Sequence, residues 1–143
     1  MIAVVDYGAG NVRSVMHALE YIGKKSLLTR DAGEILSADA VILPGVGAFG
    51  DAMEQLRASG AVQAMEEFIA SGRPFLGICI GEQLLFESSE ETPGAKGLCW
   101  LRGQVKRIPS GQGRKIPHMG WNQLNIMKDD PLFSGLPEKP WMY

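Results

Sequence analysis

Short apolar segments alternate with stretches of helical periodicity through the first half of the chain, and this order limits the possible folds. Strands are expected at residues 2–6, 26–29, 40–43 and 74–78. Helices are expected at residues 12–22, 32–36, 52–57, 62–70 and 81–86. A helix between two strands is typical of a crossover unit, in which the strands run parallel. The sequence therefore predicts the α/β class, with three layers: a mostly parallel sheet and helices on both of its faces.

The second half of the chain has a different character. Residues 88–97 are polar and rich in turn formers, and strands are expected at 105–108 and 123–126, separated by a loop at 110–114. These strands predict a short antiparallel β extension. A chain of 143 residues is long enough to bury a core, so we expect a single domain of residues 1–143.

The overall composition argues against several classes of protein. The chain is 45% hydrophobic with a net charge of −2, which gives no strong positive field for nucleic acid. Two cysteines do not make a disulfide scaffold, and the N-terminal segment reaches Asp6 too early for a signal peptide. No apolar run is long enough to span a bilayer. We therefore expect a cytoplasmic protein that binds neither nucleic acid nor membrane.

Basic residues gather in one stretch of the second half. They are Arg102, Lys106, Arg107, Arg114 and Lys115. We interpret this stretch as a solvated surface run, and the alternative is a docking patch for an acidic partner.

Glycine-rich turns follow three of the expected strands. They lie at residues 8–10, 45–47 and 77–81. In open parallel sheets, ligands bind at the carboxyl ends of the strands. The three turns therefore indicate a binding or catalytic site at this edge.

The third turn, Gly-Ile-Cys-Ile-Gly at 77–81, carries most of the functional signal. A strand that enters a helix through this pattern has the layout of a nucleophile elbow, with the sulfur of Cys79 as the attacking atom. The start of a helix favours a thiolate, and the N–H group of Ile80 is available to a developing oxyanion. The alternative is a small buried cysteine that ends a strand. Cys99 lacks such a context and is expected to be a packed, inert thiol.

The second turn offers further backbone donors. If strand 40–43 lies beside strand 74–78, the N–H group of Val46 or Gly47 completes an oxyanion hole with Ile80. A plain tight turn is the alternative. A phosphate cradle is disfavoured because the P-loop pattern is absent, and a dinucleotide site at 8–10 is disfavoured because Arg13 replaces the third glycine.

Four segments together resemble the triad-type, or class I, glutamine amidotransferases, in particular the family of glutaminase subunits of imidazole glycerol phosphate synthase. They are residues 5–11, 43–49, 77–86 and 117–122. The cysteine elbow marks the broad class. The pair Asp-Tyr-Gly-Ala-Gly-Asn and Pro-His-Met-Gly-Trp-Asn is more specific to this subunit family.

The resemblance implies a flavodoxin-like fold and a function in histidine biosynthesis. Cys79 would form a glutamyl thioester with glutamine and release ammonia, and Gln83 would contact the substrate. Ammonia would pass to a (β/α)₈-barrel cyclase subunit, which makes imidazole glycerol phosphate and aminoimidazole carboxamide ribotide. No metal or other cofactor is implied.

The resemblance also implies a docking face for the cyclase. Asn11 and the segment with His118, Met119 and Trp121 would lie at or near it. A local packing cluster is the alternative for His118 and Trp121.

Two departures from the family pattern modify these expectations. Glu82 stands where the family usually has methionine, and a carboxylate near the elbow disfavours a thiolate unless it points outward. The family's catalytic His-x-Glu pair is not found, and neither His17 nor His118 matches it. We expect a C-terminally incomplete glutaminase with little turnover. The alternatives are an inactive module that docks the cyclase and another cysteine-elbow hydrolase.

Overall fold

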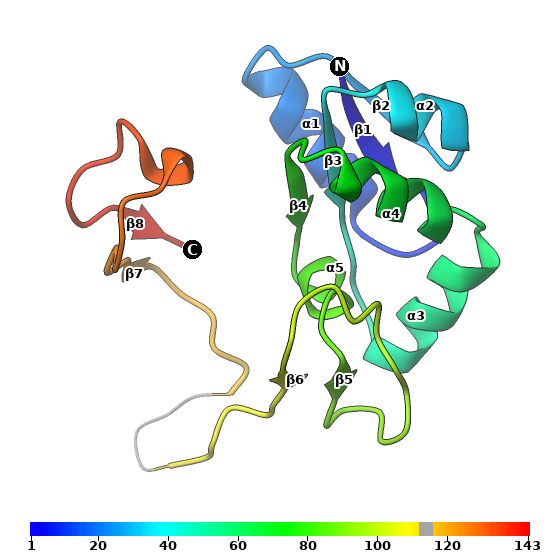
Figure 1. Cartoon of the computed structure of the whole chain (residues 1–143). Helices are drawn as coiled ribbons and strands as arrows, with labels where there is room; N and C mark the ends of the chain where they lie inside the picture. Colours follow the sequence, from blue (N-terminus) through cyan, green and yellow to red (C-terminus); the bar gives the residue numbers. More distant parts are fainter. Residues whose placement is uncertain (112–115) are drawn as a thin grey trace. The chain divides into compact units, whose positions relative to one another are not determined.

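A computed structural model describes residues 1–111 and 116–143 of the chain (Figure 1). Arg114 and Lys115 of the basic stretch, and most of the loop expected at 110–114, lie outside the described residues. The chain divides into two compact units, Met1–Arg107 and Ile108–Tyr143, and each is described by itself.

The first unit contains a four-stranded parallel sheet. Its strands are β1 (Ile2–Val5), β2 (Ser26–Thr29), β3 (Ala40–Leu43) and β4 (Phe75–Gly77). Their order across the sheet is β2-β1-β3-β4, and every neighbouring pair is parallel. Leu43 at the end of β3 pairs with Gly77 at the end of β4, so these strands finish side by side. The predicted mostly parallel sheet is confirmed.

Helices cover both faces of this sheet, as predicted. They are α1 (Val12–Tyr21), α2 (Ala32–Ser37), α3 (Phe49–Ala58), α4 (Val62–Ala70) and α5 (Ile80–Gln83). Side chains alternate along β1, so Val4 packs with Leu19 of α1 on one face. Ala3 and Val5 face the larger core, which includes Phe68 of α4.

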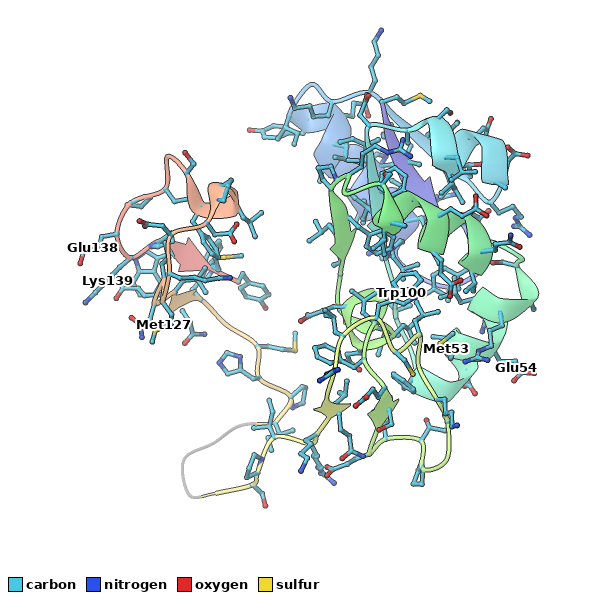
Figure 2. All side chains as sticks on the ribbon, in the orientation of Figure 1. Met53, Glu54, Trp100, Met127, Glu138 and Lys139 are labelled. Atoms are coloured by element: carbon cyan, nitrogen blue, oxygen red, sulfur yellow. The ribbon has the colours of Figure 1, made fainter. Side chains whose placement is uncertain are left out.

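The larger core also takes in α3 and the segment after α5. On α3, Met53 is buried while the adjacent Glu54 is exposed, and Figure 2 labels both side chains. Trp100 packs against the same core and meets the ring of Phe75 edge-on, with centroids 5.7 Å apart. These contacts fix the chain that follows the elbow against the end of the sheet.

Two short β pairs complete the described structure. In the first unit, β5 (Ser88–Ser89) pairs in parallel with β6 (Gln104–Val105). In the second unit, β7 (Asn122–Gln123) pairs with β8 (Trp141–Met142) and is preceded along the chain by residues 116–121. The second pair is antiparallel, which confirms the predicted antiparallel extension. Of the two expected strands only the second belongs to it, as β7, while the first forms β6 and pairs in parallel; both are shorter than expected and begin one residue earlier. A 3₁₀ turn, η1 (Pro131–Phe133), lies between β7 and β8 in the sequence.

Within residues 1–111 and 116–143, no helix has the length and apolar character needed to cross a membrane.

Candidate active site

Cys79 occupies a strained position on the turn between β4 and α5. Its backbone angles are φ 57° and ψ −118°, a conformation that non-glycine residues rarely adopt. The side chain is exposed at the carboxyl end of the sheet rather than packed beneath it. The strand, sharp turn and helix expected of a nucleophile elbow are therefore present.

The glycine loop at 45–47 lies directly against the elbow. A Cβ atom on Gly45 would come within 2.5 Å of the Gly81 nitrogen and 2.8 Å of the Tyr7 hydroxyl oxygen. A Cβ atom on Gly81 would overlap the carbonyl oxygen of Leu43. These contacts require glycine at both positions, because any side chain would push the loop and the elbow apart. Strands β3 and β4 are neighbours in the sheet, and the predicted oxyanion hole between the two turns requires this arrangement.

The backbone N–H groups predicted to form the oxyanion hole lie at this edge. Within the described part of the chain, the N–H groups of Val46, Gly47 and Ile80 have no acceptor. The next amide along the elbow is occupied, since Gly81 donates to the carbonyl group of Ile78 at 3.0 Å. The residues predicted to form the oxyanion hole therefore carry unpaired donors next to the cysteine turn.

Helix α5 is shorter than predicted. It ends at Gln83, whereas the periodicity indicated a helix to Phe86. Beyond Gln83 the α-helical bonds give way to tighter i→i−3 bonds, since Leu85 donates to Glu82 at 3.0 Å and Phe86 donates to Gln83 at 3.1 Å. The carbonyl groups of Leu84 and Leu85 accept from Leu98 at 2.8 Å and from Leu101 at 2.9 Å. A helix of four residues has a weak dipole, so unpaired N–H groups contribute more to anion binding here than the helix as a whole.

Two neighbours of the elbow affect its electrostatics. Glu82 is exposed, so the carboxylate faces solvent and its effect on a thiolate is screened. Tyr7 is 4% exposed, and its hydroxyl has no hydrogen-bond partner within the described residues. Burial and, to a smaller extent, the negative charge of Cys79 raise the pKa of Tyr7 to about 12. The phenol therefore stays protonated beside the site.

An open cavity of about 690 Å³ adjoins the elbow. Its lining residues are Ile80, Gln83, Ser89, Glu90, Glu91, Val105, Lys106 and Arg107. Ile80 and Gln83 were expected at the site. The sequence did not identify the others as site residues. Ser89, Glu90 and Glu91 lie in a stretch that has only the polar, turn-rich character of a loop, and Lys106 and Arg107 were interpreted as part of a solvated surface run.

The acidic side of this cavity is held in place by backbone donors. The Glu91 carboxylate accepts the N–H group of Phe49 at 2.8 Å. The Glu90 carboxylate accepts the N–H group of Arg107 at 3.0 Å. Acidic and basic groups thus share one cavity, which suits a ligand that carries both charges.

The residues expected at the docking face belong to different units. Asn11 caps α1 by accepting the N–H group of Ser14 at 3.3 Å. In the second unit His118 lies 3.2 Å from the side-chain amide of Asn122, and Trp121 meets Tyr143 edge-on. Met119 and Trp121 are nonetheless 69% and 66% exposed, more than a purely internal packing cluster would require.

Cys99 and His17 are the other cysteine and histidine considered in the sequence. Cys99 is exposed, so the expectation that it is packed is wrong. The side chain of His17 is exposed in the middle of α1. Within the described ranges, no group of three or more His, Cys, Asp or Glu side chains is arranged to hold a metal ion.

Comparison with known proteins gives a consistent set of relatives. The family model for glutamine amidotransferase class-I matches residues 3–143. The chain is 50% identical over 143 residues to the imidazole glycerol phosphate synthase subunit HisH of Bacillus cereus (strain G9842), covering 100% of this chain and 68% of that protein. It is 49% identical over 143 residues to the HisH subunit of Oceanobacillus iheyensis, covering 100% of this chain and 70% of that protein. A solved glutamine amidotransferase has the same fold, with a TM-score of 0.69 and 21% identity over 88% of this chain and 65% of that chain.

Proposed function

Because the chain belongs to the class-I glutamine amidotransferases and, among them, to the HisH subunits of imidazole glycerol phosphate synthase, we propose that Cys79 cleaves the side-chain amide of glutamine. The main support is the position of Cys79 on a strained turn against the glycine loop at 45–47. The family match extends across both units, which supports a single amidotransferase domain of residues 1–143.

Glutamine binds in the cavity beside the elbow. A free amino acid carries an ammonium and a carboxylate, and the cavity offers Glu90 and Glu91 for the first and Lys106 and Arg107 for the second. Gln83 lines the same cavity and can bind the substrate through its amide. The substrate side chain then points toward Cys79.

The reaction proceeds through a covalent thioester. The Cys79 thiolate attacks the amide carbon, and the resulting oxyanion binds the N–H groups of Ile80 and of Val46 or Gly47. The carbon–nitrogen bond breaks, the nitrogen takes up a proton and ammonia leaves. Water then attacks the thioester, which yields glutamate and regenerates the thiol.

The second step needs a base that activates water. Within the described residues, no side chain hydrogen-bonds to Cys79. His118 belongs to the second unit and contacts Asn122. We expect attack by water to be slow without a base, so the thioester accumulates and turnover is low.

A cyclase subunit is the proposed partner, because the relatives at 50% and 49% identity are named as subunits of imidazole glycerol phosphate synthase. Asn11, His118, Met119 and Trp121 are the proposed docking residues, and all four are exposed. Ammonia released at Cys79 passes to this partner. A reducing cytoplasmic location, which we also propose, keeps both thiols free.

The experiment that tests this function traps the thioester. The chain is mixed with radiolabelled glutamine, quenched in acid and digested, and the labelled peptide is identified. We expect label on the peptide that contains Cys79, none after Cys79→Ala, and unchanged label after Cys99→Ala. Label on Cys99, or label that survives Cys79→Ala, contradicts the proposal.

One observation favours a second function, namely the lack of a base near Cys79 among the described residues. If no adduct and no ammonia form while the chain still binds the cyclase, the chain acts as a docking module. Cyclase binding without chemistry therefore separates the two functions.

A further inference from the structure

A single residue, Ala48, connects the glycine loop at 45–47 to α3. Ala48 is the N-cap of α3, and its side chain makes no capping hydrogen bond. The first N–H groups of a helix have no acceptor within the helix, and alanine is a poor N-cap because it supplies none. The start of α3, and with it the end of the loop, therefore depends on acceptors from elsewhere in the chain.

The missing acceptors come from a turn 42 residues further along the chain. The Glu91 carboxylate accepts the N–H group of Phe49 at 2.8 Å. The Thr92 hydroxyl accepts the N–H group of Gly50 at 3.2 Å. Packing reinforces the second bond, since a Cβ atom on Gly50 would lie 2.6 Å from the Thr92 methyl group. Residues 91 and 92 thus replace the absent cap of α3.

This turn also belongs to the cavity wall. Glu91 lines the cavity beside the elbow, and the N–H group of Glu91 donates to Ser89 on β5 at 3.2 Å. One short segment therefore contacts both the substrate cavity and the helix that holds the oxyanion loop. Because Ala48 alone separates the loop from α3, a displacement of the first turn of α3 also displaces the N–H groups of Val46 and Gly47.

From this arrangement we propose that Thr92 is a positioning residue for the oxyanion loop, acting through its hydrogen bond to Gly50. The inference rests on the proposed glutaminase function. Thr92 is not among the residues that line the cavity, so its hydroxyl acts on the loop rather than on the substrate. A loop displaced by a fraction of an ångström loses alignment with a developing oxyanion, while ground-state binding in the cavity is kept.

The test compares two electrophiles on Thr92→Val, which keeps the side-chain shape and removes the hydroxyl. A chloroketone analogue of glutamine develops an oxyanion when Cys79 attacks it. Iodoacetamide is displaced at a saturated carbon and develops none. We expect the maximal inactivation rate with the chloroketone to fall about tenfold. Its half-saturating concentration and the iodoacetamide rate stay within about twofold of the wild-type values.

Two further variants serve as controls. Thr92→Ser keeps the hydroxyl and should restore the chloroketone rate. Asp31→Ala removes a helix cap of the same kind, the acceptor of the Glu34 N–H group at 3.0 Å on α2, and should leave both rates unchanged. Equal loss of both rates in Thr92→Val, a changed half-saturating concentration alone, or no change would each overturn the positioning role.

A second readout separates failure of this inference from failure of the glutaminase function. If the wild-type chain does not react with the chloroketone, the proposed function fails. The backbone amide resonances of Gly45 and Gly47 then still decide whether Thr92 positions the loop. We expect Thr92→Val to shift both resonances and Thr92→Ser to leave them near their wild-type positions. Unchanged resonances in Thr92→Val contradict the inference whether or not the chloroketone reacts.

Discussion

Cys79 has an exposed sulfur and a strained backbone conformation, which contacts with neighbouring residues must stabilise. A non-glycine residue at φ 57° and ψ −118° costs on the order of 1–3 kcal/mol. The close approach of Gly45 and Gly81 stabilises this conformation, because it packs the loop after β3 against the turn after β4. Strain of this kind is typical of sites where a side chain must be presented rather than buried.

Tyr7 makes the stability of the fold depend on alkaline pH. A tyrosine in the unfolded chain has a pKa of about 10, and the folded protein raises the pKa of Tyr7 to about 12. As the pH rises through this window, the unfolded chain loses the proton while the folded chain keeps it. The free energy of unfolding therefore falls by about 1.4 kcal/mol per pH unit, and below the window Tyr7 has no such effect.

Tyr7→Phe removes this dependence. Urea unfolding at about pH 9 and about pH 11 should show that the wild type loses roughly 1.4 kcal/mol more stability than the variant between the two conditions. Other titrating groups cancel in the comparison, because both proteins carry them. Parallel losses in the two proteins contradict the burial of a protonated phenol.

The glycine loop and the elbow behave as one element, and Gly45 is the contact between them. Gly45→Ala places a methyl group within 2.8 Å of both Ile80 Cβ and the Tyr7 hydroxyl. We expect a loss of about 1–3 kcal/mol in urea unfolding and a large fall in alkylation of Cys79.

Gly60→Ala is the matched control for that variant. Gly60 has φ 76° with no atom within 4 Å of an added Cβ, so its substitution strains the backbone without touching the elbow. It should cost roughly 1 kcal/mol and leave the reactivity of Cys79 unchanged. Wild-type reactivity in Gly45→Ala would show that the loop and the elbow are independent.

Most elements were predictable because their signals are local. The strands of the sheet and α4 follow from apolar runs and helical spacing, and the structure matches both closely. The length of α5 was not predictable, since the chain tightens after Gln83 into i→i−3 bonds and then pairs with residues 98 and 101. Pairing of this kind depends on residues far away in the sequence.

The same distinction holds for the site. The elbow, the loop at 45–47 and Gln83 are marked by glycine spacing and family resemblance, which are visible in the sequence. Glu91 and Thr92 are not, because their role depends on contacts with α3 across 42 residues of chain. The hydroxyl of Tyr7, which has no hydrogen-bond partner among the described residues, was not predicted either. A sequence that places a tyrosine next to a turn does not show whether its oxygen finds a partner.

At the scale of the whole molecule, the second unit provides three of the four proposed docking residues, His118, Met119 and Trp121. Trp121→Ala should weaken binding of the cyclase subunit by about tenfold or more, because exposed tryptophans often anchor interfaces. Trp141→Ala is the matched control, since Trp141 lies in the same unit and is 62% exposed, close to the 66% of Trp121. Isothermal titration with the purified cyclase measures both. Equal effects of the two substitutions would count against a docking role specific to Trp121.

The most direct measurement follows the alkylation of both cysteines in one sample. Cys79 and Cys99 are both exposed and both have positive φ, 57° and 60°, so Cys99 is an internal reference for exposure and backbone strain. After treatment with the chloroketone analogue, mass spectrometry of the peptides gives a rate for each. We predict that Cys79 reacts more than about tenfold faster than Cys99 and that glutamine protects Cys79 alone. Equal rates, or a Cys79 rate that glutamine does not lower, would contradict the assignment of Cys79 as the residue that attacks glutamine.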